Sequence, residues 1–494
     1  MLRGKGVLGI GKNKMDVMSQ ADLLAIDLGT QSLRLTAFDR TGKKQWNWSA
    51  PVDSYIHGDI FEQSTEQWGT LLLRGFHEAR HVGIRPKAIA ATGPLAGYVA
   101  LDTEGRALCP AVMYTDRRSA PEAKLVEAII LEQPDDSGLR VHIADPIPQW
   151  LRICREFPEV AQNTTHFLDA TGWINFFLTG LATVNAFTGL RLYTSETQSL
   201  LGLKNPPFGK ITPVGHAIGT LRPSIAEALG VESAKVISAT FDSKCAYLGS
   251  GLTNPGQATE ISGTVSSLGV LSSRHIQDKA RRIYSVPFLN SYLVRGSTAA
   301  AGSSLEWAMH NLLHCNHAEL GALLENSTPG ANGLCFLPYL AGERTPLWNP
   351  WASGALLGLK LESTKSDIAR AVIEGLAFSV GHIAAVIAEC GVRMEEIFLA
   401  GGLARNDLLC QIKADVLNIP VKIFSDHELT SIGLGVIMAI SMGYFRDMPE
   451  ATAAFTHIEE EFTPNTNTQN LHKVAFKKYL EYSKALAPLY SITK

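Results

Sequence analysis

The stretch LLAIDLGTQSLRLTAFD, from Leu23 to Asp39, decides the fold of this chain. An apolar, strand-like run carries one acid, Asp27, breaks at Gly29-Thr30-Gln31-Ser32 and resumes as a second strand. A turn that only reverses the chain would need the glycine alone. Glycine turns flanked by Thr and Ser place backbone N–H groups and hydroxyls close to a phosphate. We therefore expect a β-hairpin whose tip, with Arg34 beside it, contacts phosphate.

Asp27 lies on the strand just before this tip. A carboxylate at that position can hold Mg²⁺ through water, because the ion usually keeps several of its waters. An ordinary hairpin with an Asx-type turn would explain the same residues. One copy of the pattern leaves both interpretations open.

A second copy of the pattern occurs in the run ATEISGTVSSLGVLSS. Its turn, Gly263-Thr264-Val265-Ser266, restates the first one. The chain therefore resembles two copies of one α/β unit. Two copies facing each other would create a cleft lined by two hairpin tips, and ligands prefer clefts between domains. The repeat favours phosphate binding over an ordinary turn.

Length and composition indicate a soluble protein of two α/β domains. The 494 residues exceed one ordinary domain, and 46% hydrophobic residues supply large cores. Strand-like and helix-like segments alternate along the chain. The formal net charge of −3 gives no reason to expect nucleic acid or a membrane surface as a partner. We find no apolar run of the roughly 20 residues that span a bilayer.

The cysteines and the N-terminus indicate a cytoplasmic protein. Seven cysteines are scattered without a CxxC pair, as expected of reduced thiols. The apolar stretch within residues 1–20 is too short for a signal peptide, so we interpret these residues as an N-terminal extension.

Periodicity and capping patterns predict the main helices. One helix is expected from Thr65, the expected N-cap, to His81. Further helices are expected over 119–132, 146–156, 170–180, 301–314, 366–390 and 406–417, with an amphipathic helix near the C-terminus. The glycine-rich segment 249–258 is expected to be a linker.

Asp242 follows the strand-like run KVISAT where a helix is expected to begin. An N-cap is one interpretation, since Asp is common at that position. A general base at the carboxyl end of a strand is the other, because α/β enzymes place their chemistry there. The two interpretations are compatible.

Two further patterns are set aside. The run from Gly6 to Asn13 nearly matches the phosphate loop GxxxxGK[ST], but Asn13 lacks the hydroxyl that holds Mg²⁺. His310, His314 and His317 share one face of an expected helix, but no carboxylate cluster accompanies them at metal-ligand spacing.

Six motifs in order resemble the FGGY family of carbohydrate kinases, which has the actin and hexokinase-like fold. They are IDLGTQSLRLTAFD, ISGTVSS, GSTAAAGSSLEW, FLPYLAGERTPLWNP, GALLGLKLESTKSDIARAVIE and FLAGGLARNDLLCQIKADVLNIPV. The resemblance implies an α/β fold of two actin-like (ribonuclease H-like) domains, with mixed sheets flanked by helices and an active site in the interdomain cleft. Residues 21–252 would bind the sugar and carry the catalytic Asp, and residues 253–494 would bind ATP.

Carried over by position, the resemblance implies transfer of the γ-phosphate of ATP to a sugar hydroxyl. Asp242 would be the catalytic base, and Asp27 and Asp242 would hold Mg²⁺ through water. The ATP phosphates would contact Thr30, Gln31, Ser32, Arg34, Gly263 and Thr264. The nucleotide would contact Gly302, Gly401, Gly402 and Asn406. The sugar would contact Leu95, Ala96, Tyr114, Asp116, Asp242 and Ser243.

The sugar side departs from the family pattern. Xylulokinases carry Gly-Gln-Met-His-Gly where this chain has the run from Gly93 to Gly97, so the sugar-contacting histidine is absent. They place Asn after the catalytic Asp, where this chain has Ser243, and the family's Trp is replaced by Tyr114. The Arg-Glu pair of glycerol kinases is also missing. A site built to pair a hydroxyl discriminates strongly against analogues lacking it, so these changes predict altered specificity.

The expected substrate is a small sugar, first of all a ketopentose such as xylulose or ribulose. Another polyol or a sugar acid, such as glycerol or a gluconate-like compound, stays open. So does a non-catalytic sugar or nucleotide sensor of the same fold. The acid pair Asp27 and Asp242, which a sensor would not need, favours catalysis. Related enzymes are often dimers, and the resemblance extends the expectation of a homodimer to this chain.

Overall fold

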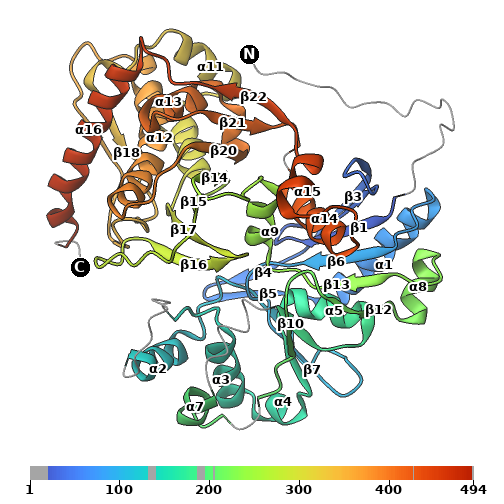
Figure 1. Cartoon of the computed structure of the whole chain (residues 1–494). Coiled ribbons are helices and arrows are strands. Elements are labelled where there is room, and N and C mark those ends of the chain that lie inside the picture. Colours follow the sequence, from blue (N-terminus) through green and yellow to red (C-terminus); the bar gives the residue numbers. More distant parts are fainter. Residues whose placement is uncertain (1–20, 132–140, 186–194, 204–205, 427, 492–494) are drawn as a thin grey trace. The chain divides into compact units, whose positions relative to one another are not determined.

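A computed structural model describes residues 21–131, 141–185, 195–203, 206–426 and 428–491, which form two compact units (Figure 1). The first unit holds the described residues of Met15–Gly251 together with Glu428–Thr456. The second holds those of Leu252–His427 and His457–Lys494. The sequence assigns Glu428–Thr456 to the second domain, whereas its contacts place it in the first unit. The N-terminal extension and its phosphate-loop-like run lie outside the described residues.

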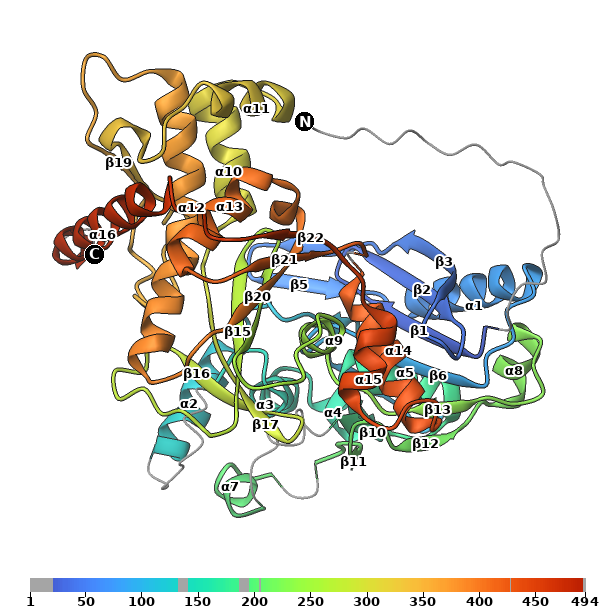
Figure 2. The same cartoon turned by 45° about the horizontal axis from the view of Figure 1, so that its top comes forward.

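The first unit is built on a six-stranded mixed sheet in the order β12-β13-β6-β1-β2-β3 (Figure 2). Its strands are β1 (Leu23–Leu28), β2 (Ser32–Phe38), β3 (Lys44–Pro51), β6 (Ala88–Thr92), β12 (Ala217–Thr220) and β13 (Lys235–Ile237). β1, β2 and β3 form an antiparallel meander, and β6 and β13 run parallel to β1. The opening stretch is therefore the expected hairpin.

Helices cover both faces of this sheet. Leu24 and Ile26 of β1 share a core cluster with Trp68 and Phe76 of α1 (Thr65–His81). On the opposite face of the sheet, α14 (Leu429–Ser441) packs against β1, β6 and α9 (Asp242–Gly249), as Figure 1 shows. The remaining helices of the unit are α2 (Ala120–Leu131), α3 (Pro146–Glu156), α4 (Pro158–Asn163), α5 (Ala170–Thr179), α7 (Ser195–Leu200), α8 (Pro223–Leu229) and α15 (Met448–Phe455). The short strands are β4 (Tyr55–His57), β5 (Ile60–Gln63), β7 (Val99–Leu101), β8 (Ala111–Val112), β9 (His166–Leu168), β10 (Thr183–Asn185) and β11 (Lys210–Thr212).

The helices α9 and α14 cross with their backbones in contact. A Cβ at Gly249 would lie 1.9 Å from the carbonyl oxygen of Leu429. A Cβ at Gly433 would lie 1.9 Å from the carbonyl oxygen of Cys245. Only glycine fits at these two positions, so the crossing fixes α9 against the segment that returns from late in the chain.

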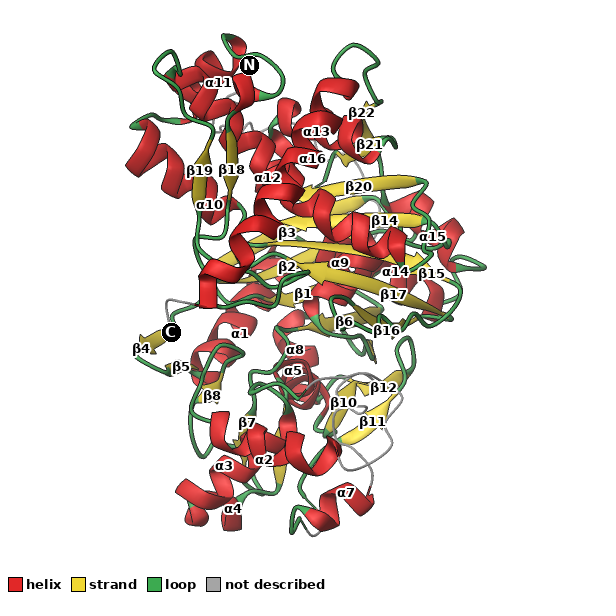
Figure 3. Cartoon of the chain, turned by 90° about the vertical axis from the view of Figure 1, so that its left-hand side faces the viewer, coloured by secondary structure: helices red, strands yellow, loops and turns green. Residues whose placement is uncertain are grey.

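The second unit repeats the plan of the first on a seven-stranded sheet, in the order β16-β17-β15-β14-β20-β21-β22 (Figure 3). Its strands are β14 (Gln257–Ser262), β15 (Ser266–Ser272), β16 (Tyr284–Phe288), β17 (Ser291–Ser297), β20 (Glu396–Gly401), β21 (Val421–Phe424) and β22 (Ile458–Phe462). β14, β15 and β17 are successive antiparallel neighbours, with β16 antiparallel to β17 at the sheet edge. On the other side of β14, the strands β20 and β21 run parallel to it, and β22 is an antiparallel edge strand, as β6, β13 and β12 are in the first unit. The predicted internal repeat is confirmed.

The helices of the second unit surround its long central helix, α12 (Lys365–Glu389). By length and composition α12 could cross a membrane, but 83% of its apolar window is buried within the protein, as in the core helix of a soluble protein. The other helices are α10 (Gly302–Trp307), α11 (His317–Glu325), α13 (Asp407–Leu417) and α16 (Gln469–Leu486). A small two-stranded sheet pairs β18 (Cys335–Leu337) with β19 (Ala355–Leu357).

Several helix boundaries differ from the predicted ones. Ser64, not Thr65, is the N-cap of α1, because its side chain accepts a hydrogen bond from the backbone of Gln67. Asp242 is not an N-cap either, since it is the first residue of α9 and Phe241 occupies the cap position. The helix expected over 301–314 changes at residue 308 into a π-helix over Ala308–Leu313.

Candidate active site

Both candidate acids of the first unit lie at the edge where its parallel strands end. Asp27 pairs in register with Thr92 of the neighbouring strand β6. The hydroxyl of Thr92 donates to the carbonyl of Thr240, 2.6 Å away, two residues before Asp242. Burial, and then the negative charges of Asp242 and Asp27, raise the pKa of Cys245 to about 12. Both carboxylates therefore lie close enough to the Cys245 thiol to act on its pKa. They lie at the edge of the sheet where α/β enzymes place their catalytic residues.

Asp27 is a buried carboxylate with a single cationic partner. Its side chain is 5% exposed, and its Oδ2 accepts from the guanidinium of Arg34 at 3.2 Å. Burial raises the pKa of Asp27 to about 6, although Arg34 acts in the opposite direction. The Arg34 side chain is 41% exposed, so the pair opens to solvent on the arginine side.

Hydrogen bonds to the backbone fix the conformation of the first hairpin tip. The N–H of Gly29 donates to the carbonyl of Ser32 at 2.9 Å. The carbonyl of Thr30 accepts from the amide of Gln63 at 2.9 Å and from the hydroxyl of Ser54 at 3.4 Å. Gln31 is exposed, and Thr30 and Ser32 are half-buried. The tip keeps its polar groups accessible on a fixed backbone, as phosphate binding requires.

A groove lies behind this tip, in the first unit. It has a volume of about 800 Å³ and is lined by residues 53–55, by residues 62–67 at the end of β5 and the start of α1, and by residues 107–110. Gln63, which holds Thr30, also lines it. Sequence reasoning did not predict this groove, because its wall comes from segments that are distant in the chain.

Asp242 is tied directly to the loop that carries two predicted sugar contacts. Its backbone N–H donates to the carbonyl of Gly93 at 3.1 Å. The loop after Gly93 contains Leu95, which is half-buried, and Ala96, which is 2% exposed and adopts a φ of 76°. Asp242 and Ser243 are half-exposed at the start of α9. The structure therefore brings these predicted sugar-side residues together.

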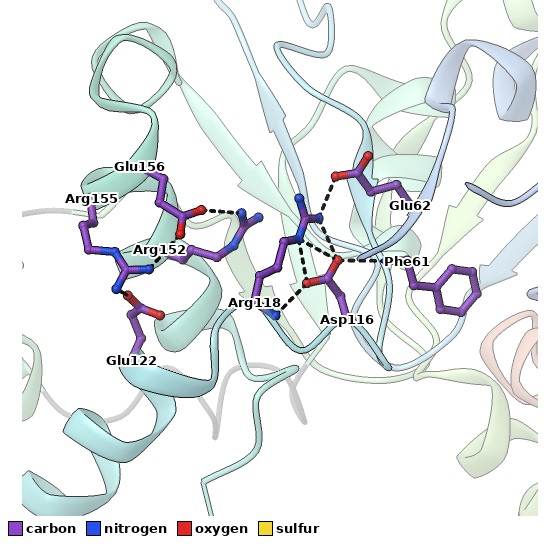
Figure 4. Close-up of polar contacts among 8 residues, drawn as sticks. All are labelled: Phe61, Glu62, Asp116, Arg118, Glu122, Arg152, Arg155 and Glu156. Carbon is purple, nitrogen blue, oxygen red and sulfur yellow. Dashed lines mark hydrogen bonds and ion pairs between the residues drawn. The ribbon is translucent and has the colours of Figure 1, made fainter. Parts of the chain in front are cut away.

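The other two predicted sugar contacts, Tyr114 and Asp116, differ in their exposure to solvent and in their hydrogen bonding within the protein. Tyr114 is 40% exposed and meets the ring of Phe61 edge-on, with 6.2 Å between ring centroids. Asp116 is fully buried, and its carboxylate accepts from the backbone of Phe61 at 3.0 Å and from Arg118 at 2.6 Å (Figure 4). Arg118 also donates to Glu62 at 2.6 Å. Asp116 is thus engaged by protein groups on both of its oxygens.

A second ion-pair cluster holds the helices α2 and α3 together, as Figure 4 shows. Arg155 of α3 lies 2.7 Å from Glu122 of α2 and 2.7 Å from Glu156. Arg152, 2% exposed, donates to Glu156 at 2.9 Å. Sequence reasoning missed Arg118, Glu62 and these helical pairs; the Asp-x-Arg spacing of YTDRRS was the one available signal for Arg118.

The second hairpin tip is joined to the start of α10. The N–H of Gly302 donates to the carbonyl of Gly263 at 3.0 Å, and that of Ala301 donates to the carbonyl of Thr264 at 2.9 Å. A Cβ at Gly302 would lie 2.6 Å from the Gly263 carbonyl oxygen, so the contact requires glycine. The structure therefore brings Gly263, Thr264 and Gly302 together.

The remaining predicted nucleotide residues adjoin this tip. Gly401 pairs with Ser262 at the end of β14, where a Cβ on Gly401 would lie 2.2 Å from the Ser262 carbonyl oxygen. The space around Gly402 is open, since a Cβ there would meet nothing within 4 Å. Asn406 is the N-cap of α13, and its side chain accepts from the backbone of Leu409 at 2.9 Å. Gly402 thus leaves room for a ligand, while Asn406 is engaged by its helix.

The carboxylates suit Mg²⁺ only in a water-mediated way. Within the described parts of the chain, we find no group of three or more His, Cys, Asp or Glu residues that would hold a metal. His310, His314 and His317 are included in that search. Mg²⁺ in phosphate-transfer sites is typically bound by one or two carboxylates, substrate phosphates and water. Asp27 and Asp242 offer that kind of donor set.

Comparison with known proteins identifies the family. The profile of the FGGY family of carbohydrate kinases, N-terminal domain, matches residues 23–249, and that of the C-terminal domain matches residues 259–442. The chain belongs to the FGGY family of carbohydrate kinases. It is therefore a phosphotransferase acting on a carbohydrate hydroxyl, and the family and fold class predicted from the sequence are confirmed.

Relatives of this FGGY kinase act on different sugars and polyols. It is 26% identical over 483 residues to the xylulose kinase of Staphylococcus epidermidis, covering 92% of this chain and 95% of that one. It is 27% identical over 474 residues to the glycerol kinase of Citrifermentans bemidjiense, covering 90% and 94%. The ligand-bound xylulose kinase of Lactobacillus acidophilus has the same fold, with a TM-score of 0.87 at 20% identity over 96% of this chain and 99% of that one.

Proposed function

We propose that this FGGY kinase transfers the γ-phosphate of ATP to a hydroxyl of a ketopentose such as xylulose or ribulose. The observation that carries the proposal is the placement of Asp242, half-exposed at the carboxyl edge of the sheet and bonded through its backbone to the Gly93 loop. Several curated relatives are xylulose kinases, which supports a ketopentose as the first choice.

Asp242 acts as the general base in this proposal. As the first residue of α9 it lies at the positive end of the helix dipole, which favours its ionised form. The crossing at Gly249 and Gly433 holds α9 in place, so the carboxylate is aimed before substrate binds. General base assistance of this kind contributes on the order of 10²–10⁴-fold in rate. The rest of the acceleration comes from positioning and charge stabilisation.

The two tips bind the phosphates in the proposal. In the first unit these contacts come from Thr30, Gln31, Ser32 and Arg34, and in the second unit from Gly263 and Thr264. Gly302, Gly401, Gly402 and Asn406 lie on the nucleoside side. Asp27 and Asp242 would hold Mg²⁺ through water, and the ion would supply positive charge against the phosphates.

The sugar contacts proposed for the first unit fall into two classes. Leu95, Ala96, Tyr114 and Ser243 lie against the sugar. The carboxylate of Asp116 orients Arg118, because its oxygens already accept from Arg118 and the backbone of Phe61. We propose residues 21–252 as the sugar-binding domain and residues 253–494 as the ATP-binding domain. The seven cysteines are all free thiols, which supports a cytoplasmic enzyme. A homodimer is proposed by analogy with the family.

The test is a panel of ketoses, aldoses, polyols and aldonates, with ADP release measured with and without Mg²⁺. We expect a ketopentose to give the highest kcat/KM and chelation of Mg²⁺ to abolish turnover. If glycerol or a gluconate-like acid were the best acceptor, the proposed substrate would be a polyol or a sugar acid and not a ketopentose. A panel in which no acceptor raises ATP turnover above the rate without acceptor would favour the sensor over the kinase.

A further inference from the structure

A charged pair lies in the core of the second unit, next to its hairpin tip. Glu260 of β14 is 0% exposed and Lys413 of α13 is 2% exposed. The ammonium of Lys413 lies 2.6 Å from each carboxylate oxygen of Glu260. Burying two charges costs desolvation free energy that their mutual attraction only partly recovers. Such a pair is therefore poor evidence of stabilisation, and a role in specifying local geometry has to be considered.

The carboxylate of Glu260 also holds both strands where they leave the sheet. The hydroxyls of Ser262 and Ser266 both donate to its Oε1. These two serines form the last residue pair of the β14–β15 ladder before the tip. Glu260 and Ser262 are two residues apart on one strand and so point to the same face. One carboxylate thus fixes both sides of the Gly263–Val265 turn.

Lys413 comes from the segment predicted to bind the nucleoside. It lies on α13, which begins after the N-cap Asn406 and the glycine pair at the end of β20. That strand also runs beside β14, with Gly401 opposite Ser262. The salt bridge therefore fastens the nucleoside-side helix to the phosphate-side hairpin, in addition to the backbone ladder between the strands.

We propose that Glu260 and Lys413 are positioning residues for the nucleotide phosphates: the buried pair holds the second tip in its binding conformation, although neither residue contacts the nucleotide. This inference rests on the proposed ATP-binding role of the second unit. Without the pair, the serine hydroxyls lose their shared acceptor and the tip samples more conformations. Phosphate binding must then order the tip, which lowers affinity.

The decisive variant is Glu260→Met with Lys413→Met, which removes both charges and leaves no unpaired ion in the core. Its matched control is Glu396→Met with Lys422→Met, a pair at 2.6 Å that joins β20 to β21 in the same sheet and is only partly buried. Dissociation constants of ADP and of adenosine are measured by titration calorimetry for wild type and both variants.

We expect the Glu260/Lys413 variant to bind ADP about tenfold more weakly and adenosine within twofold of wild type, because only phosphates use the tip. The control pair should change neither constant. An ADP constant within twofold of wild type would overturn the proposal, and so would equal weakening of ADP and adenosine. If the variant fails to fold, Ser262→Ala with Ser266→Ala tests the same link with the ion pair left intact, and the same selective loss for ADP is expected.

Hydrogen exchange of the amides of residues 263–266, without nucleotide, separates this inference from the proposed function. Faster exchange in the Glu260/Lys413 variant than in wild type is expected, and unchanged exchange contradicts the positioning role. Wild-type protein that binds neither ADP nor adenosine would overturn the proposed ATP-binding role and with it the role of the pair in phosphate binding. Unchanged exchange in a variant whose wild type binds ADP would overturn only the inference.

Discussion

The hairpin tips of the two units share a backbone design and differ in where they place charge. In both, the turn glycine donates to a nearby carbonyl at 2.9 Å, from Gly29 to Ser32 and from Gly263 to Val265. At the first tip Asp27 pairs with Arg34, whose side chain is 41% exposed. At the second, the charged pair Glu260–Lys413 is sealed in the core.

The difference separates two uses of a carboxylate. A buried acid with a solvent-facing partner, such as Asp27, can exchange protons and meet a metal or phosphate from outside. An acid whose oxygens are filled by a lysine and two serines, such as Glu260, can only hold its neighbours in place. The repeat in the sequence thus supplies two similar turns, and the surroundings of each turn place its nearest carboxylate differently: beside an exposed arginine at the first and inside the core at the second.

The largest expected effect is on the chemistry of the first unit. Asp242→Asn keeps the shape of the side chain and removes the base, so kcat should fall on the order of 10²–10⁴-fold. Turnover is measured by ADP release with the best acceptor of the panel, and folding by the midpoint of thermal unfolding. Asp102→Asn, at an exposed turn paired with Arg106, is the control and should keep full activity. Full turnover by Asp242→Asn would remove the base assignment.

The second prediction compares the two ion pairs directly. Lys413→Met leaves the carboxyl group of Glu260 without its ionic partner in the core, which should lower the free energy of unfolding by about 3–5 kcal/mol. Arg34→Met removes a cation whose side chain is 41% exposed, and Asp27, whose pKa is already raised to about 6, can take up a proton in its place. The loss should therefore be smaller, about 1–2 kcal/mol. Urea denaturation of both variants checks the contrast. Equal losses would mean that the two pairs are not buried to the different degrees described.

The third prediction concerns the proton on Asp27. Its pKa is raised from 3.8 to about 6 on folding, so its contribution to stability is fully present below about pH 4 and is lost as the pH rises through 6. The shift corresponds to about 3 kcal/mol. Relative to Asp27→Asn, which does not titrate, wild type should therefore lose about that much unfolding free energy between pH 4 and pH 7.

Activity should depend on pH in the opposite sense. Protonated Asp27 no longer attracts a hydrated Mg²⁺, so kcat/KM for ATP should fall below pH 6 as stability from this group rises. Denaturation and initial rates are measured over the same pH series. Parallel pH dependence of wild type and Asp27→Asn in denaturation would contradict the raised pKa.

The smallest expected effect comes from a substitution where α9 and α14 cross, the contact that holds α9 in position. Gly433→Ala places a methyl group against the carbonyl of Cys245, and such overpacking costs about 1–3 kcal/mol. Because α9 begins at Asp242, kcat should fall as well. Gly321→Ala, in open space on α11, is the matched control and should stabilise the protein by about 0.5–1 kcal/mol. Equal behaviour of the two variants would show that the crossing tolerates a side chain.

The parts of the fold that depend on local patterns were predicted correctly. The hairpin at Asp27 and its repeat at Gly263 follow from strand periodicity broken by glycine, and α3 begins and ends where its periodicity predicts. The placement of Glu428–Thr456 was not predicted, because the apolar residues of α14 suit either core equally well. The close approach at Gly433, which joins α14 to α9, and the packing of α14 against β1 and β6 place this segment in the first unit.

The candidate site also contains residues that a local pattern indicates and residues that only long-range packing brings together. The sequence named the turn residues and Asp242 as candidates, since glycine, hydroxyl and carboxylate groups at strand ends carry their chemistry in their type and spacing; their roles stay predictions. It did not predict Arg118 and Glu62, which meet at Asp116, nor Lys413 opposite Glu260. A charged residue in a helix or strand is normally a solvated one, so its burial against a distant partner has no local signature.

The sequence by itself determined two repeated α/β units, each with a strand–glycine–strand turn, because backbone conformation responds to near neighbours. The tertiary structure alone decided which acid has an exposed partner and which is enclosed in the core, because burial and charge pairing depend on residues more than a hundred positions apart, as Glu260 and Lys413 are. For this kinase the local pattern supplies the two turns proposed to bind phosphate, and long-range packing sets the surroundings of each turn.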